Sequence, residues 1–113
     1  FASRFRQGDA LMEVYTCYPV VPMAFLMASG LVSSLRDIPA FLQQHNITIT
    51  GGMNLAKGAW NNPALNGLIG MYQRLCVDTQ GSNLSRKATL GLVHGNGGLG
   101  YRQGVAIMET LNV

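Results

Sequence analysis

Charged side chains are scarce in this chain. Asp, Glu, Lys and Arg make up 12% of its 113 residues, against about 25% in an average soluble domain. Hydrophobic residues reach 48%, and this balance excludes a disordered chain or a coiled coil, because both need far more charge. The length suits a single domain over residues 1–113. A surface so poor in charge exposes apolar patches, so we expect a partner, and a homo-oligomer is one form it can take.

The excess of positive charge is small and dispersed. Eight Lys and Arg against five Asp and Glu give a net charge of +3, and the basic residues are scattered from Arg4 to Arg102. A nucleic-acid-binding domain gathers such residues on one face or along one helix. The sequence therefore predicts no nucleic-acid partner.

Cysteine is nearly absent. Cys17 and Cys76 lie far apart with no Cys-x-x-Cys spacing, which predicts neither a disulfide framework nor a metal site and favours a reducing, cytoplasmic location. The uncharged run 14–35 is long enough for a membrane helix, but Pro19, Pro22 and Gly30 fall inside it, so we expect no membrane span. Because the first residue is Phe1, we expect a piece of a longer chain.

Strand and helix patterns alternate along the chain. Alternating β-formers predict strands, and capping residues, Pro63 and Gly30 mark helix ends. Ordered along the chain, the predicted elements are a strand at 11–18, a helix at 22–28, a helix from Ser33 or Ser34 to His45 and Asn46, a strand at 46–50, a loop at 51–62, a helix from Pro63, a loop or hairpin at 78–87, a strand at 88–93, a glycine turn, and a strand at 101–111. This order predicts an α/β fold, a mixed β-sheet covered by helices.

The helix from Pro63 carries the clearest apolar periodicity. Six residues fall on one stripe at helical spacing and are predicted to face the core: Leu65, Leu68, Ile69, Tyr72, Leu75 and Cys76.

Gly95, Gly97 and Gly100 form the pattern G-x-G-x-x-G directly after a predicted strand. A dinucleotide site would need a helix next and an acidic residue about 20 positions later, and the sequence has neither. We therefore predict a strand-to-strand turn, where glycines let the backbone approach a ligand or another loop.

Three segments together resemble a known family. They are VYTCYP at 14–19, GGMNLAKGAWNN at 51–62 and GLVHGNGGLG at 91–100. In this order and spacing they resemble the C-terminal half of a thiolase-superfamily protein, in the branch of sterol-carrier-protein-type thiolases and atypical acetyl-CoA acetyltransferases. The resemblance runs from about Asp9 to Val113.

The resemblance implies a subunit of two similar α/β halves packed face to face. The nucleophilic cysteine belongs to the N-terminal half, which is missing here, so the chain alone is expected to be inactive. The implied activity is that of an acyl-CoA acyltransferase of lipid metabolism, which forms or cleaves carbon–carbon bonds by Claisen chemistry. The implied substrate is acyl-CoA, with no tightly bound cofactor.

The chain departs from ordinary thiolases at three motif positions. Gly58 stands in place of the histidine that activates the nucleophile, Tyr15 replaces an Asn or His, and His94 replaces the acid/base cysteine. A second hypothesis therefore stays open: a non-catalytic lipid- or CoA-binding or assembly module that keeps the thiolase-like fold.

Cys17 and His94 are the candidate catalytic residues. Cys17 is either a thiol nucleophile or acid/base group, or a packed core residue. His94 is either a general acid/base or a donor to a thioester oxygen, or a histidine satisfied by neighbouring backbone.

The candidate substrate-binding residues are Asn61, Asn62, Asn96, Gly97 and Gly98. Asn61 and Asn62 can present amides to a ligand carbonyl, although helix capping also explains at least one of them. Because loops that follow neighbouring strands meet at one edge of a sheet, we expect the asparagines to surround one concavity with Cys17 and His94.

Overall fold

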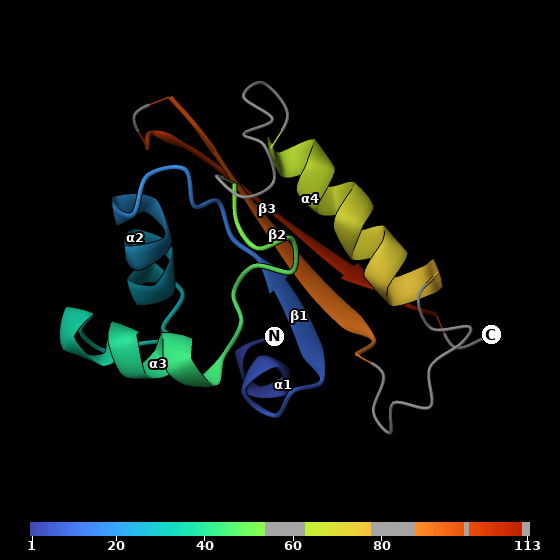
Figure 1. The fold of residues 1–113 in the computed structure, drawn as a ribbon, viewed down its shortest axis with the longest axis horizontal. Coiled ribbons are helices and arrows are strands. Elements are labelled where there is room, and N and C mark those ends of the chain that lie inside the picture. The colour runs from blue at the N-terminus through green and yellow to red at the C-terminus, as the bar shows by residue number, and fades with distance from the viewer. Residues whose placement is uncertain (54–62, 78–87, 99, 112–113) are drawn as a thin grey trace.

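The computed structural model describes residues 1–53, 63–77, 88–98 and 100–111. Figure 1 shows the elements in chain order. They are α1 (Ala2–Arg6), β1 (Ala10–Glu13), α2 (Val20–Ala28), the 3-10 turn η1 (Leu35–Asp37), α3 (Ile38–Gln44), α4 (Pro63–Tyr72), the π-helical turn η2 (Gln73–Val77), β2 (Leu90–Gly97) and β3 (Arg102–Glu109).

The three strands form one mixed sheet in the order β1-β2-β3. β1 runs parallel to β2, with Ala10 opposite Leu90, and β2 runs antiparallel to β3, with Leu90 opposite Glu109. The predicted fold class is confirmed at this level: a small α/β domain with a mixed sheet packed against helices.

Helices pack against both faces of the sheet, and each face has its own apolar cluster. Met12 and Leu92 point to the side of α1, α2 and α3, where they pack with Leu26 and Ile38. The opposite face, which includes Val93, packs against α4 through Met71 and against η2 through Leu75. Figure 1 shows α4 on one side of the strands and the other helices on the opposite side. Full burial of each such side chain contributes about 1.5–3 kcal/mol.

Glycines line the contact between α4 and β2. A Cβ atom on Gly91 would lie 2.3 Å from the sulfur of Met71, and one on Gly67 would lie 3.0 Å from Val93 Cγ1. At Gly95 a Cβ atom would lie 3.0 Å from that of Ala64. The close approach therefore depends on the absence of side chains at these positions.

The prediction of which residues face the core from the helix beginning at Pro63 is wrong in part. Leu75 is buried and Leu68 is half-buried, as predicted. Four other members of the stripe are exposed: Leu65, Ile69, Tyr72 and Cys76. The helix is turned because close packing selects Ala64 and Gly67 for the sheet side, and the larger residues point outward.

The helix boundaries agree closely with the sequence pattern. Ser34 and Asp37 form a reciprocal capping box, His45 caps α3, and α4 begins at Pro63. Of the predicted strand 46–50, only an isolated bridge between Thr48 and Glu13 is present. The predicted loop 78–87 lies outside the described residues.

β2 is longer than predicted and continues through Gly97, so His94 lies on a strand and not in a turn. The chain then reverses into β3, which confirms the strand-to-strand turn. Gly98 and Gly100 have φ angles of 63° and 93°, the left-handed region that favours glycine.

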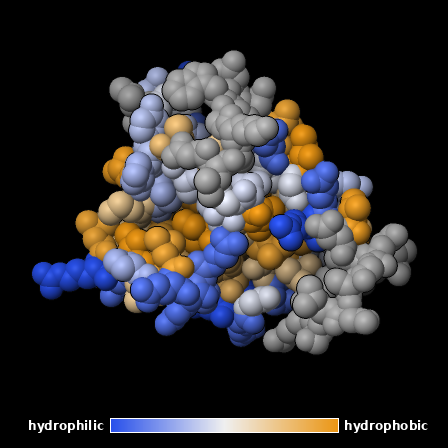
Figure 2. Space-filling model, viewed as in Figure 1, coloured by the Kyte–Doolittle hydropathy of each residue, from blue (hydrophilic) through white to orange (hydrophobic). Residues whose placement is uncertain are grey.

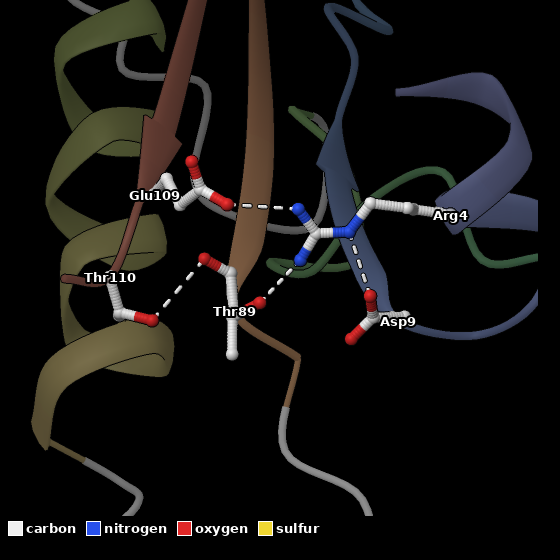
Figure 3. Close-up of polar contacts among 5 residues, drawn as sticks. All are labelled: Arg4, Asp9, Thr89, Glu109 and Thr110. Atoms are coloured by element: carbon white, nitrogen blue, oxygen red, sulfur yellow. Dashed lines mark hydrogen bonds and ion pairs between the residues drawn. The ribbon is translucent and has the colours of Figure 1, made fainter. Parts of the chain in front are cut away.

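Arg4 ties α1 to the start of β2 and the last residue of β3 (Figure 3). Its guanidinium donates to Asp9 Oδ2 at 2.7 Å, to Glu109 Oε1 at 2.9 Å and to the Thr89 hydroxyl. The hydrogen bonds to Glu109 and then Asp9 raise the pKa of Arg4. This cluster joins α1 to one end of the β2–β3 pair, where β2 begins and β3 finishes.

Within the described residues, no helix is long and apolar enough to cross a membrane.

Candidate functional site

The carboxyl ends of β1 and β2 lie side by side because the two strands are parallel. Tyr15 and Cys17 follow β1, while His94 and Asn96 lie at the end of β2. Gln103 of β3 is directly opposite Asn96 in the antiparallel register. Five polar side chains from three strands are thereby brought to one edge of the sheet.

Tyr15 connects the end of β1 to β2. Its phenol lies near the Cys17 thiol and the Asn96 side chain, and both affect its pKa. Burial, followed by the proximity of Cys17, raises the pKa of Tyr15, whereas Asn96 lowers it. Tyr15 is therefore protonated at neutral pH, and it brings together two of the residues predicted for the site, Cys17 and Asn96.

Gln103 extends this connection to His94. Its Oε1 lies 2.6 Å from His94 Nε2, and its Nε2 donates to Asn96 Oδ1 and, at 3.0 Å, to the Gly100 carbonyl. The result is a group of neighbouring polar side chains, which we call the polar chain: Cys17, Tyr15, Asn96, Gln103 and His94. Within it, Gln103 is hydrogen-bonded to both Asn96 and His94. Tyr15 and Gln103 are not among the residues predicted for the site.

His94 is the buried end of the polar chain. Its exposed fraction is only 2%, its ring stacks on Phe25 with centroids 4.5 Å apart, and its Nδ1 has no hydrogen-bond partner among the described residues. Burial lowers the pKa of His94, and the contact with Gln103 opposes this in part. The imidazole is therefore neutral at pH 7.

An apolar groove of about 440 Å³ opens beside His94, between α2 and β3. Its polar lining comes from His94 and Gln103. The apolar wall is formed by Val20, Val21, Ala24, Phe25, Ala28 and Val105.

Two side chains of the β1 segment hold residues 50–53 at the same edge. The buried carboxylate of Glu13 accepts from the Thr50 hydroxyl at 2.6 Å and from the Thr50 amide at 3.0 Å. The Thr16 hydroxyl accepts from the Met53 amide at 2.9 Å. The segment leading toward the predicted binding residues Asn61 and Asn62 therefore starts beside the polar chain, while these two asparagines lie outside the described residues.

The chain itself occupies the space beside the two predicted site glycines. Gly97 is the last residue of β2, where a Cβ atom would lie 3.3 Å from that of Arg102. At Gly98 a Cβ atom would lie 2.5 Å from the Tyr101 ring. The close approaches at these glycines are thus made by residues of the hairpin.

No three or more His, Cys, Asp or Glu side chains of the described segments are grouped to hold a metal ion. Comparison with family models, with curated proteins and with solved structures gives no match to this chain.

Proposed function

We propose that this chain supplies one half of a thiolase-like acyl-CoA acyltransferase site, which forms or cleaves carbon–carbon bonds by Claisen chemistry. The observation that carries the proposal is that Cys17, Tyr15 and Asn96 are neighbours. These residues belong to two of the three segments that resemble the family, and they meet at the carboxyl edge of the parallel strands.

The proposed chemistry gives Cys17 a role in proton transfer. A base removes a proton from the α-carbon of an acyl-CoA thioester, and the resulting carbanion attacks the carbonyl carbon of an acyl group held on the nucleophilic cysteine of the other half. That cysteine leaves as a thiolate and takes up the proton. Cys17, half-buried and close to the Tyr15 hydroxyl, is the proposed carrier of the proton.

The outer face of α4 supports a second half packed against this one. Leu65, Ile69 and Tyr72 recur at helical spacing, and between 50% and 55% of each is exposed. Cys76, in the following turn η2, is also exposed. Figure 2 shows hydrophobic surface in the region of α4. An uncharged helix face of this kind is typical of a surface that another domain covers.

The first experiment tests the assignment of the nucleophile to the other half. The chain alone is incubated with acetyl-CoA and its intact mass is measured. We expect no acyl adduct, because the covalent acyl-enzyme requires a cysteine from the other half. A stoichiometric adduct on Cys17 would overturn the assignment.

The second experiment uses the longer protein that carries this chain and follows thiolysis of acetoacetyl-CoA. We expect Cys17→Ala to lower turnover by about 10²-fold or more, which is the usual contribution of a general acid/base. Tyr15→Phe should also lower it, whereas Tyr101→Phe, at a tyrosine that is 75% exposed, serves as the matched control. A folded Cys17→Ala variant with unchanged turnover would remove Cys17 from the reaction.

His94 is proposed to act within this site from the buried end of the polar chain. His94→Ala should lower turnover by about 10²-fold if the imidazole transfers a proton or supports the groups that do. Unchanged turnover in a folded variant would reduce His94 to a packing residue.

The apolar groove beside His94 favours a second candidate, a non-catalytic lipid- or CoA-binding module. Its volume of about 440 Å³ lies within the range of small-ligand sites, about 300–1,000 Å³. Val105→Trp would fill this groove without touching Cys17. Two results together would favour the module over the enzyme. Val105→Trp would abolish binding of decanoyl-CoA, and Cys17→Ala would leave turnover unchanged.

A further inference from the structure

The two edges of the sheet differ in how the chain covers them. Along the outer edge of β1, the Ile49 amide donates to the Met12 carbonyl at 3.2 Å. The Val14 amide continues this pairing and donates to the Ile47 carbonyl at 2.9 Å. β3 forms the opposite edge, and no backbone hydrogen bond between the described residues reaches its outer side.

The outer side of β3 carries the backbone groups of alternate residues. The Thr110 amide donates at 2.9 Å to the carbonyl of Thr89, which lies directly opposite it. A residue bonded in this way points its N–H and C=O groups toward the neighbouring strand, and the next residue points them away. Because β3 pairs with β2 without a bulge, the outward groups belong to Gln103, Val105, Ile107 and Glu109.

β3 has none of the features that usually protect a sheet edge. Soluble proteins block such edges with proline, with bulges or with charged side chains along the strand. β3 is paired regularly along its whole length, and its only charges, Arg102 and Glu109, lie at its two ends. Between them, Val105 is 55% exposed and Ile107 is 60% exposed. The strand is therefore open to pairing with another strand.

The sequence of β3 is complementary to a second copy of itself. In an antiparallel pair around a two-fold axis, the register centred on Ala106 brings every outward N–H and C=O group into the ladder. This register places Val105 opposite Ile107 of the second copy, and Gln103 opposite Glu109 of the second copy. β-branched residues thus face each other, as do polar residues, and such cross-strand pairs stabilise a sheet.

Other registers lose this match. A register centred on Val105 would place Gln103 opposite Ile107 of the second copy and would leave Glu109 outside the strand pair. A register centred on Ile107 would place Val105 opposite Glu109 of the second copy. Both put a polar residue opposite an apolar one.

We propose that β3 pairs antiparallel with β3 of a second copy of this chain, in the register centred on Ala106. The two sheets then form one continuous sheet across the two-fold axis. The pairing uses the edge of β3 and not the outer face of α4, and it stands whether or not acyl transfer is the reaction.

Disulfide trapping tests the register directly. In a chain that carries Cys17→Ser and Cys76→Ser, the substitution Ala106→Cys places a thiol opposite the same thiol of the second copy. The backbone groups of Ala106 point to β2, so across the axis it forms a non-hydrogen-bonded pair. The Cα atoms of such a pair are about 4.5 Å apart, within the range for a disulfide. Oxidation with diamide should therefore give a disulfide-linked dimer.

Gly104→Cys in the same background is the matched control. A Cβ atom at Gly104 meets nothing within 4 Å, so the substitution fits the fold. The two copies of this residue would be about 14 Å apart, too far for a disulfide. Gly104→Cys should link only when mixed with Met108→Cys, its expected neighbour, and this mixed pair tests the register without any change at Ala106. No linked dimer from Ala106→Cys and from the mixed pair, or equal linking of Gly104→Cys alone, would overturn the proposal.

Sedimentation equilibrium measures the strength of the pairing. The chain carries Ile69→Glu and Tyr72→Glu in this experiment, so that association through α4 does not contribute. Val105→Lys should raise the Kd of the dimer about tenfold, because both contacts between Val105 and Ile107 are lost.

Val20→Lys, at a valine of α2 that is 67% exposed, is the control for added charge and should leave this Kd unchanged. A chain that stays monomeric before either lysine is introduced, or equal Kd values for the two lysine variants, would overturn the proposal.

Discussion

Alanine at Gly91 should destabilise the protein by about 2 kcal/mol, within the range of about 1–3 kcal/mol for overpacking a dense core. The new Cβ atom would lie 2.3 Å from the sulfur and 2.6 Å from Cγ of Met71. Met71 is fully buried between α4 and the sheet, so it has no solvent into which to move. Its flexible thioether can relieve part of the contact, which keeps the expected loss below the upper limit.

Gly104→Ala is the matched control for this substitution. Gly104 also lies in a strand, and a Cβ atom there meets nothing within 4 Å. Both substitutions reduce the conformational freedom of the unfolded chain to a similar extent. The difference between the two variants therefore isolates the contact with Met71.

Urea unfolding followed by circular dichroism measures the two free energies of unfolding. Thermal unfolding should show a shift of about 4 °C for each kcal/mol in a domain of this size. Met71→Ala should weaken the effect of Gly91→Ala in a double mutant, because the added methyl group then fills part of a cavity. Equal stabilities of the Gly91→Ala and Gly104→Ala variants would refute the close packing of α4 on β2.

Three further predictions concern pH, salt and association. Burial lowers the pKa of His94, so the unfolded chain takes up a proton near the ordinary value of about 6.5 before the folded chain does. As the pH falls from 7.5 to 5, stability should therefore fall more steeply in the wild type than in His94→Gln. The same pH dependence of the urea midpoint in both proteins would contradict this. Arg4→Met should lower the melting temperature at low salt, and the difference should shrink at high salt because the ion pairs are partly exposed; equal melting temperatures at low salt would show that the cluster contributes nothing. Ile69→Glu combined with Tyr72→Glu should reduce self-association in ultracentrifugation and binding of a hydrophobic dye, with little loss of stability. Unchanged association would show that another surface mediates it.

The sequence predicts the helices of this fold well because residues close to each helix end determine where it lies. One helix start is set by the capping box of Ser34 and Asp37, and the other by Pro63. These residues act on neighbours within one turn, and both starts lie where the sequence pattern predicts them. The rotation of α4 is not local. It depends on how closely the helix approaches β2, and therefore on glycines in a strand that the chain reaches much later.

The candidate site divides in the same way. The convergence of Cys17 and Asn96 follows from parallel strands and could be predicted from the order of the elements. Gln103 could not, because its place in the polar chain depends on the register that puts it opposite Asn96. Pairing the residues on either side of the glycine turn, one by one, gives the hairpin register. That register is the sequence signal that would have identified Gln103. The buried Glu13 carries no sequence signal, since its partner Thr50 is joined to it only by the fold.

The mixed sheet also sets the order in which the site can assemble during folding. β2 and β3 are joined by a short turn, and hairpins of this kind form in about 1–10 μs. β1 pairs with β2 only after a loop covering most of the chain has closed, a slower step because of the entropy of the intervening residues. His94, Asn96 and Gln103 can thus be held together in the hairpin first. Tyr15 and Cys17 join them when β1 docks, so the Cys17 end of the polar chain is the last part to form.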